Sequence, residues 1–322
     1  DLDLKVDSTA VLSDTLSDCF AFDGVTNADL SKVKAYRIPV DPNVENGGFD
    51  EAQKTELKVN GENPDVTVTV DGKKLTVTGF DYGANAVTRH TNTDGTETFT
   101  GAKLRITFPI QPDTAYTGWK VGTYPYDTNS IKDGEQAGLS NYKDRNENKA
   151  PDTLLDQSPK SNVTAYEVKY QWSGEHPTLT AAPLPADSTY IPGQKYTVSN
   201  QYTLNQEVRE ENTIYTFQGW KNGNADATIG ESYDISGNVT LTGTWTKRAA
   251  SFTVKGEIDH GTVTNEDQTV DAGTSSAEMV FTPAAGYKIT GVTVNGTPKT
   301  GYTLAENGTY TYPAETVNQN IT

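Results

Sequence analysis

The sequence is short of cysteine, of basic residues and of long apolar runs. Cys19 is the one cysteine in 322 residues, which excludes an intramolecular disulfide framework. Lys and Arg number 26 against 43 Asp and Glu, giving a formal net charge of −17. Because phosphate groups are bound by clustered Lys and Arg, this balance argues against nucleic acid or an anionic membrane as a partner. No apolar stretch approaches the length of a membrane span, so we expect no membrane insertion.

Residues that usually carry catalysis are few or scattered. The three histidines fall in different parts of the chain, with no metal-binding spacing between them: His90, His176 and His260. Cys19 stands beside Phe20 and suits a small buried residue better than a nucleophile. Carboxylates are so abundant that a glycosidase-like pair would arise by chance. We therefore predict a protein that is not an enzyme and needs no cofactor.

One acidic stretch begins like a calcium-binding loop. It runs from Asp41 to Glu51, but Asn46 stands where the loop needs glycine and Ala52 where it needs a bidentate Glu. The sequence therefore predicts no metal site of the usual kind. A looser Ca²⁺ site stays open as an alternative.

Alternating apolar and small polar residues are what the sequence has in plenty. The run Ile214–Trp220 carries aromatic residues at both alternating sets of positions, so we expect a strand covered on both faces, and Asn238–Trp245 gives a second strand. Residues 66–78 predict a hairpin that turns at Asp71-Gly72 with a type I′ turn. Residues 101–110 predict a strand whose core face is formed by Leu104, Ile106 and Phe108. A short helix is expected over residues 28–33, capped by Asn27.

The middle of the chain resembles the Listeria-Bacteroides repeat and the similar SHIRT-type modules of Gram-positive surface proteins. The residues that carry the resemblance are Tyr166–Gly174, Leu184–Tyr190, Pro192-Gly193 and the two blocks that end in Trp220 and Trp245. The resemblance implies a stalk or adhesin module on the surface of a bacterium.

Two further resemblances flank this module. Leu12–Phe20, Val77–Tyr82 and Lys103–Ile110 are similar to the β domain that accompanies the von Willebrand A domain in pilus-tip and other large adhesins of gut Firmicutes, although no Asp-x-Ser-x-Ser of a von Willebrand A domain occurs here. Residues 249–322 resemble divergent bacterial surface repeats through Pro283-x-x-Gly-Tyr287 and Val294-Asn-Gly296. Relatives continue with one more apolar strand, so this resemblance implies a truncated repeat.

We therefore predict an all-β chain of tandem small domains, each sandwich-like or grasp-like, that together form an elongated particle. The expected domains are an adhesin-type β domain over 1–163, a repeat over 164–248 and a divergent surface repeat over 249–322. Surface domains of this kind often carry a Lys–Asn isopeptide bond, and Lys5 with Asn162 would join the first strand of the first domain to its last. A domain held by packing alone is the preferred interpretation, because no catalysing carboxylate can be identified.

Three of the four tryptophans end strand-like segments and are expected in the core. Trp119 precedes a polar stretch over 121–162, interpreted as a long loop of the kind that carries recognition, and is predicted to be exposed. The candidate binding residues are Tyr116, Trp119, Tyr124 and Tyr126.

The expected function is a non-catalytic, extracellular module of a bacterial surface adhesin, attached to the cell wall or secreted. It is expected as a monomer that binds a host protein or glycoprotein, such as an immunoglobulin or mucin, or that positions a binding domain. Protein ranks above acidic glycan because the acidic surface repels sialylated and sulfated ligands. A passive stalk and a carbohydrate-binding or carbohydrate-active module are the alternatives.

Overall fold

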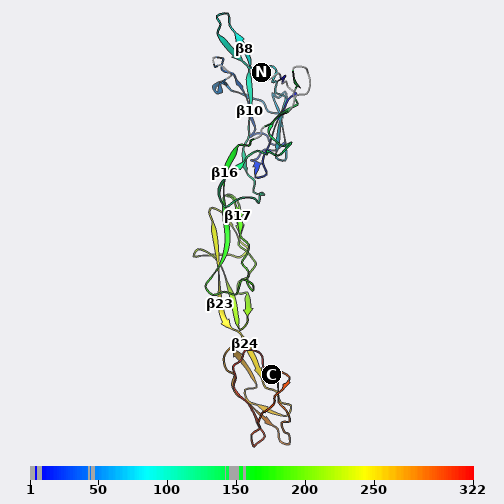
Figure 1. The fold of residues 1–322 in the computed structure, drawn as a ribbon, viewed down its shortest axis with the longest axis vertical. Helices are drawn as coiled ribbons and strands as arrows, with labels where there is room; N and C mark the ends of the chain where they lie inside the picture. Colours follow the sequence, from blue (N-terminus) through cyan, green and yellow to red (C-terminus); the bar gives the residue numbers. More distant parts are fainter. Residues whose placement is uncertain are drawn as a thin grey trace. The chain divides into compact units, whose positions relative to one another are not determined.

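The computed structural model describes residues 4–5, 9–42, 44, 48–141, 143–144, 152–154 and 157–322. Short β-strands and turns make up these residues, and their helical element is one 3₁₀ turn, η1 (Glu51–Gln53). The prediction of an all-β chain is confirmed (Figure 1). No helix in the described ranges is long and apolar enough to cross a membrane. The chain separates into two compact units, Asp1–Tyr166 and Glu167–Thr322.

The first unit is built from five small antiparallel sheets and part of a sixth. The largest orders its strands β15-β13-β2-β7-β6, and a second orders them β10-β4-β5. The strands are β1 (Leu4–Lys5), β2 (Val11–Thr15), β3 (Phe20–Phe22), β4 (Lys34–Pro39), β5 (Thr55–Leu57), β6 (Thr67–Asp71), β7 (Lys74–Thr78), β8 (Thr88–Thr91), β9 (Glu97–Thr100), β10 (Ala102–Thr107), β11 (Ile110–Pro112), β12 (Gly122–Asp127), β13 (Gly138–Ser140), β14 (Lys143–Asp144), β15 (Thr153–Leu154) and the first part of β16 (Lys160–Ser173).

The core of this unit lies between β6, β7 and β4, where valines of period-2 strands face one another. Val66, Val68 and Val77 are almost fully buried, and the predicted core face of β10 is confirmed because Leu104, Ile106 and Phe108 pack against this cluster. The predicted hairpin is also confirmed, but Asp71 pairs with Lys74, so its loop is Gly72-Lys73. Positive φ occurs at Gly72 (57°) and not at Lys73. That pattern fits a type II′ turn and not the predicted type I′.

The helix predicted over residues 28–33 is absent, and turns stand in its place. Asn27 does not cap a helix. Its side-chain amide donates to the Val70 carbonyl and its side-chain oxygen accepts from the Val70 amide, both at 2.6 Å. A long-range partner on β6 therefore takes the groups that would have capped a local helix.

The predicted long loop over 121–162 is wrong in its described parts, because strands cross it. β12 pairs with the start of β16, placing Tyr124 opposite Val163, and β13 joins the largest sheet beside β2. Strands with few large aliphatic residues, such as β12 and β13, have a weak apolar alternation, which explains why no strand is predicted here from the sequence.

The second unit begins with a twisted sheet over residues 167–249. Its order is β16-β23-β20-β19, with β17 on β16 and β21 on β20, and β18 pairs with β22. The strands are β17 (Ser188–Tyr190), β18 (Lys195–Thr197), β19 (Glu207–Glu210), β20 (Thr213–Asn222), β21 (Ala225–Ala227), β22 (Ser232–Asp234) and β23 (Val239–Ala249). β16 and β23 run parallel, whereas β20 pairs antiparallel with β23.

Phe217 and Trp220 share one face of β20, contrary to the prediction of a strand with both faces covered. A β-bulge between Phe217 and Gly219 shifts the register, and Gly219 has a φ of 109°. The bulge leaves Gln218 exposed and turns both aromatic rings into the core. Phe217 and Trp220 are 0% and 1% exposed, with ring centroids 5.3 Å apart.

Strands within residues 251–322 form three separate small sheets. Their strands are β24 (Ser251–Lys255), β25 (Gly261–Val263), β26 (Asp267–Asp271), β27 (Met279–Pro283), β28 (Thr293–Val294), β29 (Thr297–Pro298) and β30 (Tyr310–Tyr312). β24 pairs with β26, β27 lies between β25 and β30, and β28 pairs with β29. No sheet in the described ranges takes strands from both sides of the predicted boundary after residue 248. The division into three domains stays a prediction, since the two compact units meet after Tyr166.

Candidate functional site

A pocket of about 530 Å³ in the first unit brings together the predicted aromatic residues. Tyr116, Tyr124 and Tyr126 line it, and Trp119 lies behind them in contact with two of their rings. The remaining lining comes from residues 17–19 and 129–132 and from Gly118, Lys120, Pro125 and Asp127. The site is therefore assembled from two segments that are distant in the sequence, 17–19 and 116–132, and we call it the tyrosine pocket.

The aromatic wall follows from the period of a strand. Tyr124 and Tyr126 are two residues apart on β12 and so project from the same face. Tyr116 ends a turn in which its amide donates to the Asp113 carbonyl at 3.0 Å. The hydroxyl of Tyr126 accepts a 2.9 Å hydrogen bond from the Lys120 amide, which ties the strand to the preceding segment.

Trp119 is buried, at 6% exposure, so the prediction that it is exposed is wrong. Its ring packs edge-to-face between Tyr116 and Tyr126, with centroids 4.9 Å from each. Its indole Nε1 is buried and has no hydrogen-bond partner among the described residues. Trp119 thus supports the wall of the pocket, while its neighbours form the accessible surface.

The opposite wall is held in place by Lys73, the second loop residue of the β6–β7 hairpin. Its ammonium donates to the carbonyls of Asp18 and Phe20 at 2.7 Å each, and it forms a 2.7 Å ion pair with Asp113. This hydrogen bond holds the pKa of the Asp113 carboxyl below its usual range. These contacts of the Lys73 ammonium fix residues 17–20 beside the turn that ends at Tyr116.

Short polar contacts close the base of the pocket. The Cys19 thiol donates to the Asp127 carbonyl at 3.6 Å and lies 3.2 Å from the Ser17 hydroxyl, which also donates to that carbonyl. Cys19 is buried, as predicted from the residue beside it. These contacts join the 17–19 segment to the end of β12.

The mouth of the pocket is partly apolar and carries little net charge. Tyr124 is 43% exposed and Ile131 is 52% exposed, and the Lys120 ammonium lies 6.0 Å from the centroid of the Tyr124 ring. Asp18 and Lys132 at the rim pair at 2.8 Å, which lowers the pKa of the Asp18 carboxyl. A partner surface could pack on this ring and this aliphatic side chain without leaving a charge unpaired, because the charges beside them are already paired.

One half-buried carboxyl, that of Asp14, lies beside the pocket residue Asn129. Asp14 accepts a hydrogen bond from the side-chain amide of Asn129, and burial raises the pKa of the Asp14 carboxyl while that hydrogen bond opposes the rise. Asn129 lines the pocket. No group of three or more metal-ligating side chains occurs in the described ranges.

The other predicted positions lie away from the tyrosine pocket. Lys5 pairs with Lys143 through its backbone, and its side chain lies outside the described residues. Asn162 is exposed on β16 and pairs with Pro125, so the isopeptide bond stays a prediction. Of the candidate calcium loop, residues 43 and 45–47 lie outside the description, and the Glu51 carboxylate binds Arg105 and Lys103.

The histidines and remaining tryptophans are placed as follows. His90 contacts the Thr100 hydroxyl at 3.1 Å on the exposed β8–β9 hairpin, and His260 stacks on Tyr287. The indole of Trp172 donates to the Ala182 carbonyl at 3.1 Å. It packs in one aromatic cluster with Trp220 and Trp245, as predicted for these three residues.

Sequence reasoning missed Lys73, Ile131 and the wall formed by residues 17–19. No local pattern connects these positions, which meet only through β-pairing across a hundred residues. No protein-family model matches the chain, and no curated protein matches it either, so the function of the tyrosine pocket is argued from its chemistry.

Proposed function

We propose that this chain is a non-catalytic, extracellular module of a bacterial surface adhesin and that the tyrosine pocket contacts a host protein or glycoprotein. The single observation that supports this best is the assembly of Tyr116, Tyr124 and Tyr126 around one open pocket. Rigid aromatic rings with a polar tip give large contact area for little lost conformational entropy, which is why tyrosine is frequent at binding surfaces.

The setting of Tyr124 fits protein recognition. Its ring is 43% exposed, and its strand is held by backbone pairing to β16. A rigid scaffold that presents a part-exposed ring lowers the ordering cost of binding. The apolar neighbour Ile131, at 52% exposure, favours a protein partner over a free sugar, since sugars need several hydrogen-bond donors and acceptors beside the stacking ring.

Charge ranks the possible partners. The chain carries a net charge of −17, and the two acidic residues at the pocket, Asp18 and Asp127, are each paired with a lysine. A sialylated or sulfated partner would meet long-range repulsion that salt screens. A neutral or basic protein surface would not, so a host protein or lightly charged glycoprotein is the preferred partner.

The test is a binding screen of the full chain against host glycoproteins, immunoglobulins and glycan arrays at two salt concentrations. Tyr124→Ala is expected to weaken binding of the partner found by about tenfold or more, as for a part-exposed aromatic anchor. Tyr287→Ala is the matched control, because Tyr287 is an exposed tyrosine (54%) in residues 249–322. Binding that is lost with Tyr287→Ala and kept with Tyr124→Ala would refute the placement.

Gly118→Ala gives a second variant for the same surface. A Cβ at Gly118 would collide with the phenol of Tyr116, so the substitution displaces that ring without removing it. We expect weaker binding with little change in the thermal unfolding of the protein. Binding that is insensitive to both Tyr124→Ala and Gly118→Ala would assign the contact to another surface.

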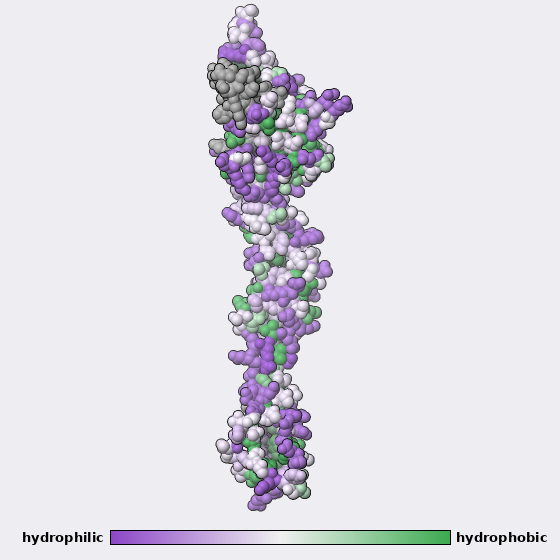
Figure 2. All heavy atoms as spheres, turned by 90° about the vertical axis from the view of Figure 1, so that its right-hand side faces the viewer, coloured by the Kyte–Doolittle hydropathy of each residue, from purple (hydrophilic) through white to green (hydrophobic). Residues whose placement is uncertain are grey.

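Two alternatives have distinct outcomes in this screen. A passive stalk built from tandem small domains would bind nothing on either array at either salt concentration. A carbohydrate-binding module would bind neutral glycans with little dependence on salt. The apolar side chains on the face seen in Figure 2 lie in small patches among polar ones, which suits a soluble, extracellular chain that presents one local contact surface.

A further inference from the structure

The strands by which the chain enters and leaves residues 167–249 lie side by side and run in the same direction. β16 begins this part of the second unit and β23 ends it. Val168–Ser173 pair in parallel with Val239–Thr244, residue for residue and without a break in register. The start of β16 and the end of β23 therefore lie at opposite ends of one parallel ladder, which we call the β16–β23 ladder.

The direction of this ladder decides how it responds to tension. A pull on the start of β16 and the end of β23 slides two parallel strands past each other. The hydrogen bonds of a parallel ladder are evenly spaced, so all of them share the force and have to break together. Strands that are pulled apart at two paired residues lose their hydrogen bonds one after another, which needs less force. Residues 167–249 are therefore pulled in the stronger of the two geometries.

β23 is held on its other side as well. It lies between β16 and β20 in the sheet. Its antiparallel pairing with β20 extends from the pair of Thr213 with Ala249 to the pair of Asn222 with Leu241, and this second ladder is longer than the first. β23 therefore stays with β20 when the chain is pulled, and the force acts on the β16–β23 ladder.

Side chains add hydrogen bonds across the same two strands. The Asn238 side chain accepts a 2.9 Å hydrogen bond from the Glu167 amide at the start of the ladder. The side-chain amide of Gln171 donates to the Thr242 hydroxyl at 3.1 Å, and these two residues lie opposite each other. Sliding the strands would break both of these hydrogen bonds, so both contribute to the same resistance.

The packed face of the ladder opposes sliding by its shape. Val168 and Leu241 are 2% and 0% exposed, and a Cβ at Gly243 would collide with the rings of Trp172 and Trp220. A pull on the end of β23 moves Leu241 toward the place of Gly243, which lies two residues further along the same face of the strand. The Leu241 side chain cannot enter that place unless the aromatic cluster opens.

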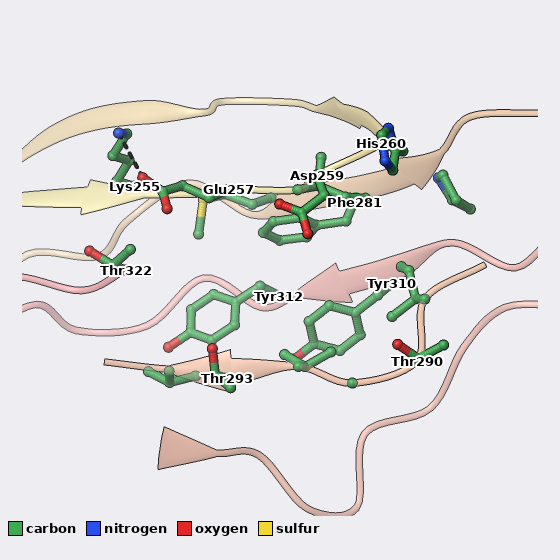
Figure 3. Close-up of a pocket in the computed structure, with 18 of the residues that line it drawn as sticks. Lys255, Glu257, Asp259, His260, Phe281, Thr290, Thr293, Tyr310, Tyr312 and Thr322 are labelled. Atoms are coloured by element: carbon green, nitrogen blue, oxygen red, sulfur yellow. Dashed lines mark ion pairs between the residues drawn. The ribbon is translucent and has the colours of Figure 1, made fainter. Parts of the chain in front are cut away.

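The core of residues 251–322 shows the contrast. It borders a pocket of about 420 Å³, and Figure 3 shows the rings of Phe281, Tyr310 and Tyr312 at that pocket. Side chains beside a pocket have room to move, whereas those of a close-packed core do not. A steric block to sliding needs close packing, and the aromatic rings of residues 167–249 provide it.

We propose that residues 167–249 have a mechanical function, in which the β16–β23 ladder keeps them folded while the chain is under tension. Tension arises when a protein is held at two places, as a surface module is when it is attached at one place and bound to a partner at another. This role rests on the proposed function, which supplies the tension. The resistance of the ladder does not depend on the tyrosine pocket, so the two are tested separately.

Single-molecule force measurements on the full chain test the ladder. Handles at Glu167 and Ala249 pull it in shear, whereas handles at Thr213 and Ala249 peel β20 from β23, because these two residues are paired. Only the chain between the handles is under force. At one loading rate we expect an unfolding force at least about twofold higher in shear, because forced unfolding is governed by the unfolding rate and only shear strains the whole ladder at once. An equal or lower force in shear would overturn the proposal.

Two glutamines give a matched pair of variants. Gln171 donates to Thr242 across the β16–β23 ladder, and Gln218 donates to Thr246 across the β20–β23 pair, both at 3.1 Å. Gln171→Ala should speed unfolding in shear by about two- to tenfold at a fixed force, the effect of one hydrogen bond of ordinary strength, and should leave peeling unchanged. Gln218→Ala should do the reverse. Faster unfolding in shear with Gln218→Ala and not with Gln171→Ala would contradict the proposal.

Equilibrium unfolding in urea separates the direction of the force from overall stability. Both glutamine variants should lose the same small amount of stability, so a difference between the two pulling geometries reports which ladder is strained. These measurements need no binding partner. A weak ladder would overturn this inference and leave the proposed contact of the tyrosine pocket standing. A strong ladder in a chain that binds nothing in the screen would refute the proposed function and leave the resistance of residues 167–249 in place.

Discussion

The β16–β23 region and the β24–β30 region begin from the same parallel bridge and end with different cores. In the first region, six aromatic rings pack in one cluster: Tyr170, Trp172, Tyr202, Phe217, Trp220 and Trp245. In the second, Phe281, Tyr310 and Tyr312 face a pocket of about 420 Å³. Val168–Val239 and Val254–Ile321 are matching pairs, so the starting geometry is shared.

The difference shows how much one strand contributes to a small β core. β23 supplies Leu241 and Trp245, which are 0% and 7% exposed. It also supplies Gly243, which lets Trp172 and Trp220 stack at 4.9 Å between centroids. In the β24–β30 region, by contrast, apolar residues such as Ile289, Val292 and Val294 are only partly buried around the core. Small domains have little buried surface to spare, so one strand decides whether the core is closed.

The largest expected effect that separates the two cores comes from Trp220→Ala. Trp220 is 1% exposed and touches Tyr170, Trp172 and Phe217. Removing a fully buried indole from a closed core should lower the free energy of unfolding by about 3–5 kcal/mol. Phe281→Ala removes a ring that already borders a pocket and should cost about half as much or less, since no new closed cavity is formed.

Urea unfolding, followed by hydrogen exchange of the two regions separately, measures both losses. Leu179→Ala is the surface control, because Leu179 is 58% exposed, and should shift stability by no more than about 0.5 kcal/mol. Equal losses for Trp220→Ala and Phe281→Ala would show that the two cores are equally closed and would break the comparison.

A pair of Gly→Ala substitutions sharpens the comparison with a smaller change. A Cβ at Gly243 would lie 2.6 Å from the Trp220 ring and would also overlap Trp172, so Gly243→Ala should cost about 1–3 kcal/mol through overpacking. A Cβ at Gly256 would lie 2.8 Å from Val263 and 3.1 Å from Met279. Gly256 and Met279 line the pocket of about 420 Å³, so the Met279 side chain has room to move, and Gly256→Ala should cost less than about 1 kcal/mol. Thermal unfolding of both variants gives the ranking, and a larger loss at Gly256 would contradict it.

The sequence predicts strands well where alternation is strong and local. The hairpin over 66–78 and the core face of β10 follow from period-2 patterns, because each apolar position faces the same core. A period-2 pattern predicts β20 wrongly, because the extra residue Gln218 in the bulge reverses the face on which each later side chain of the strand lies. A bulge is set by the partner strand and by the positive φ of Gly219, and no period in β20 alone reveals it.

Only part of the candidate site can be predicted from the sequence, namely its tyrosines and not the wall opposite them. The sequence predicts Tyr116, Tyr124 and Tyr126 as binding candidates around Trp119, beside and within a stretch expected to be a loop, and the pocket brings these three tyrosines together. The wall that completes the pocket depends on Lys73, which reaches the Asp18 and Phe20 carbonyls from a hairpin loop more than fifty residues away. Contacts of this kind come from sheet topology, which a single sequence does not specify.

Alkaline pH should lower the stability of the β24–β30 region through ionisation of the Tyr312 phenol. Burial raises the pKa of the Tyr312 phenol above its ordinary value of 10.0, and its hydrogen bond to the Glu315 carboxylate raises that pKa further. A phenol with a raised pKa in the folded protein gives stability that is complete below about pH 10 and is lost as the pH rises through the higher folded value. Thermal unfolding at pH 8, 10 and 11 should therefore show a decline that Tyr312→Phe makes shallower.

Absorbance at 295 nm provides the independent readout for that prediction. In the Tyr312→Phe variant, the rise in absorbance at the most alkaline pH values should be smaller by the contribution of one phenol. At neutral pH the same variant loses one hydrogen bond, to Glu315, and should be destabilised by about 1 kcal/mol. An alkaline decline as steep as that of the unsubstituted protein would assign the pH effect to other tyrosines.

The smallest expected effects come from two surface ion pairs, one in each region, and here the regions should not differ. Glu175 pairs with Lys247 at 2.5 Å and Glu257 pairs with Lys255 at 2.8 Å, and all four side chains are 43–70% exposed. Exposed pairs gain little because water and salt screen them and two long side chains must be ordered, so Glu175→Ala and Glu257→Ala should each change stability by no more than about 0.5 kcal/mol. In 0.5 M salt both changes should shrink further. Lys255 and Glu257 both line the pocket of the β24–β30 region, so a loss well above 1 kcal/mol for Glu257→Ala alone would mean that this ion pair holds the pocket wall in place, and the stability of the two regions would then differ through surface charge as well as through core packing.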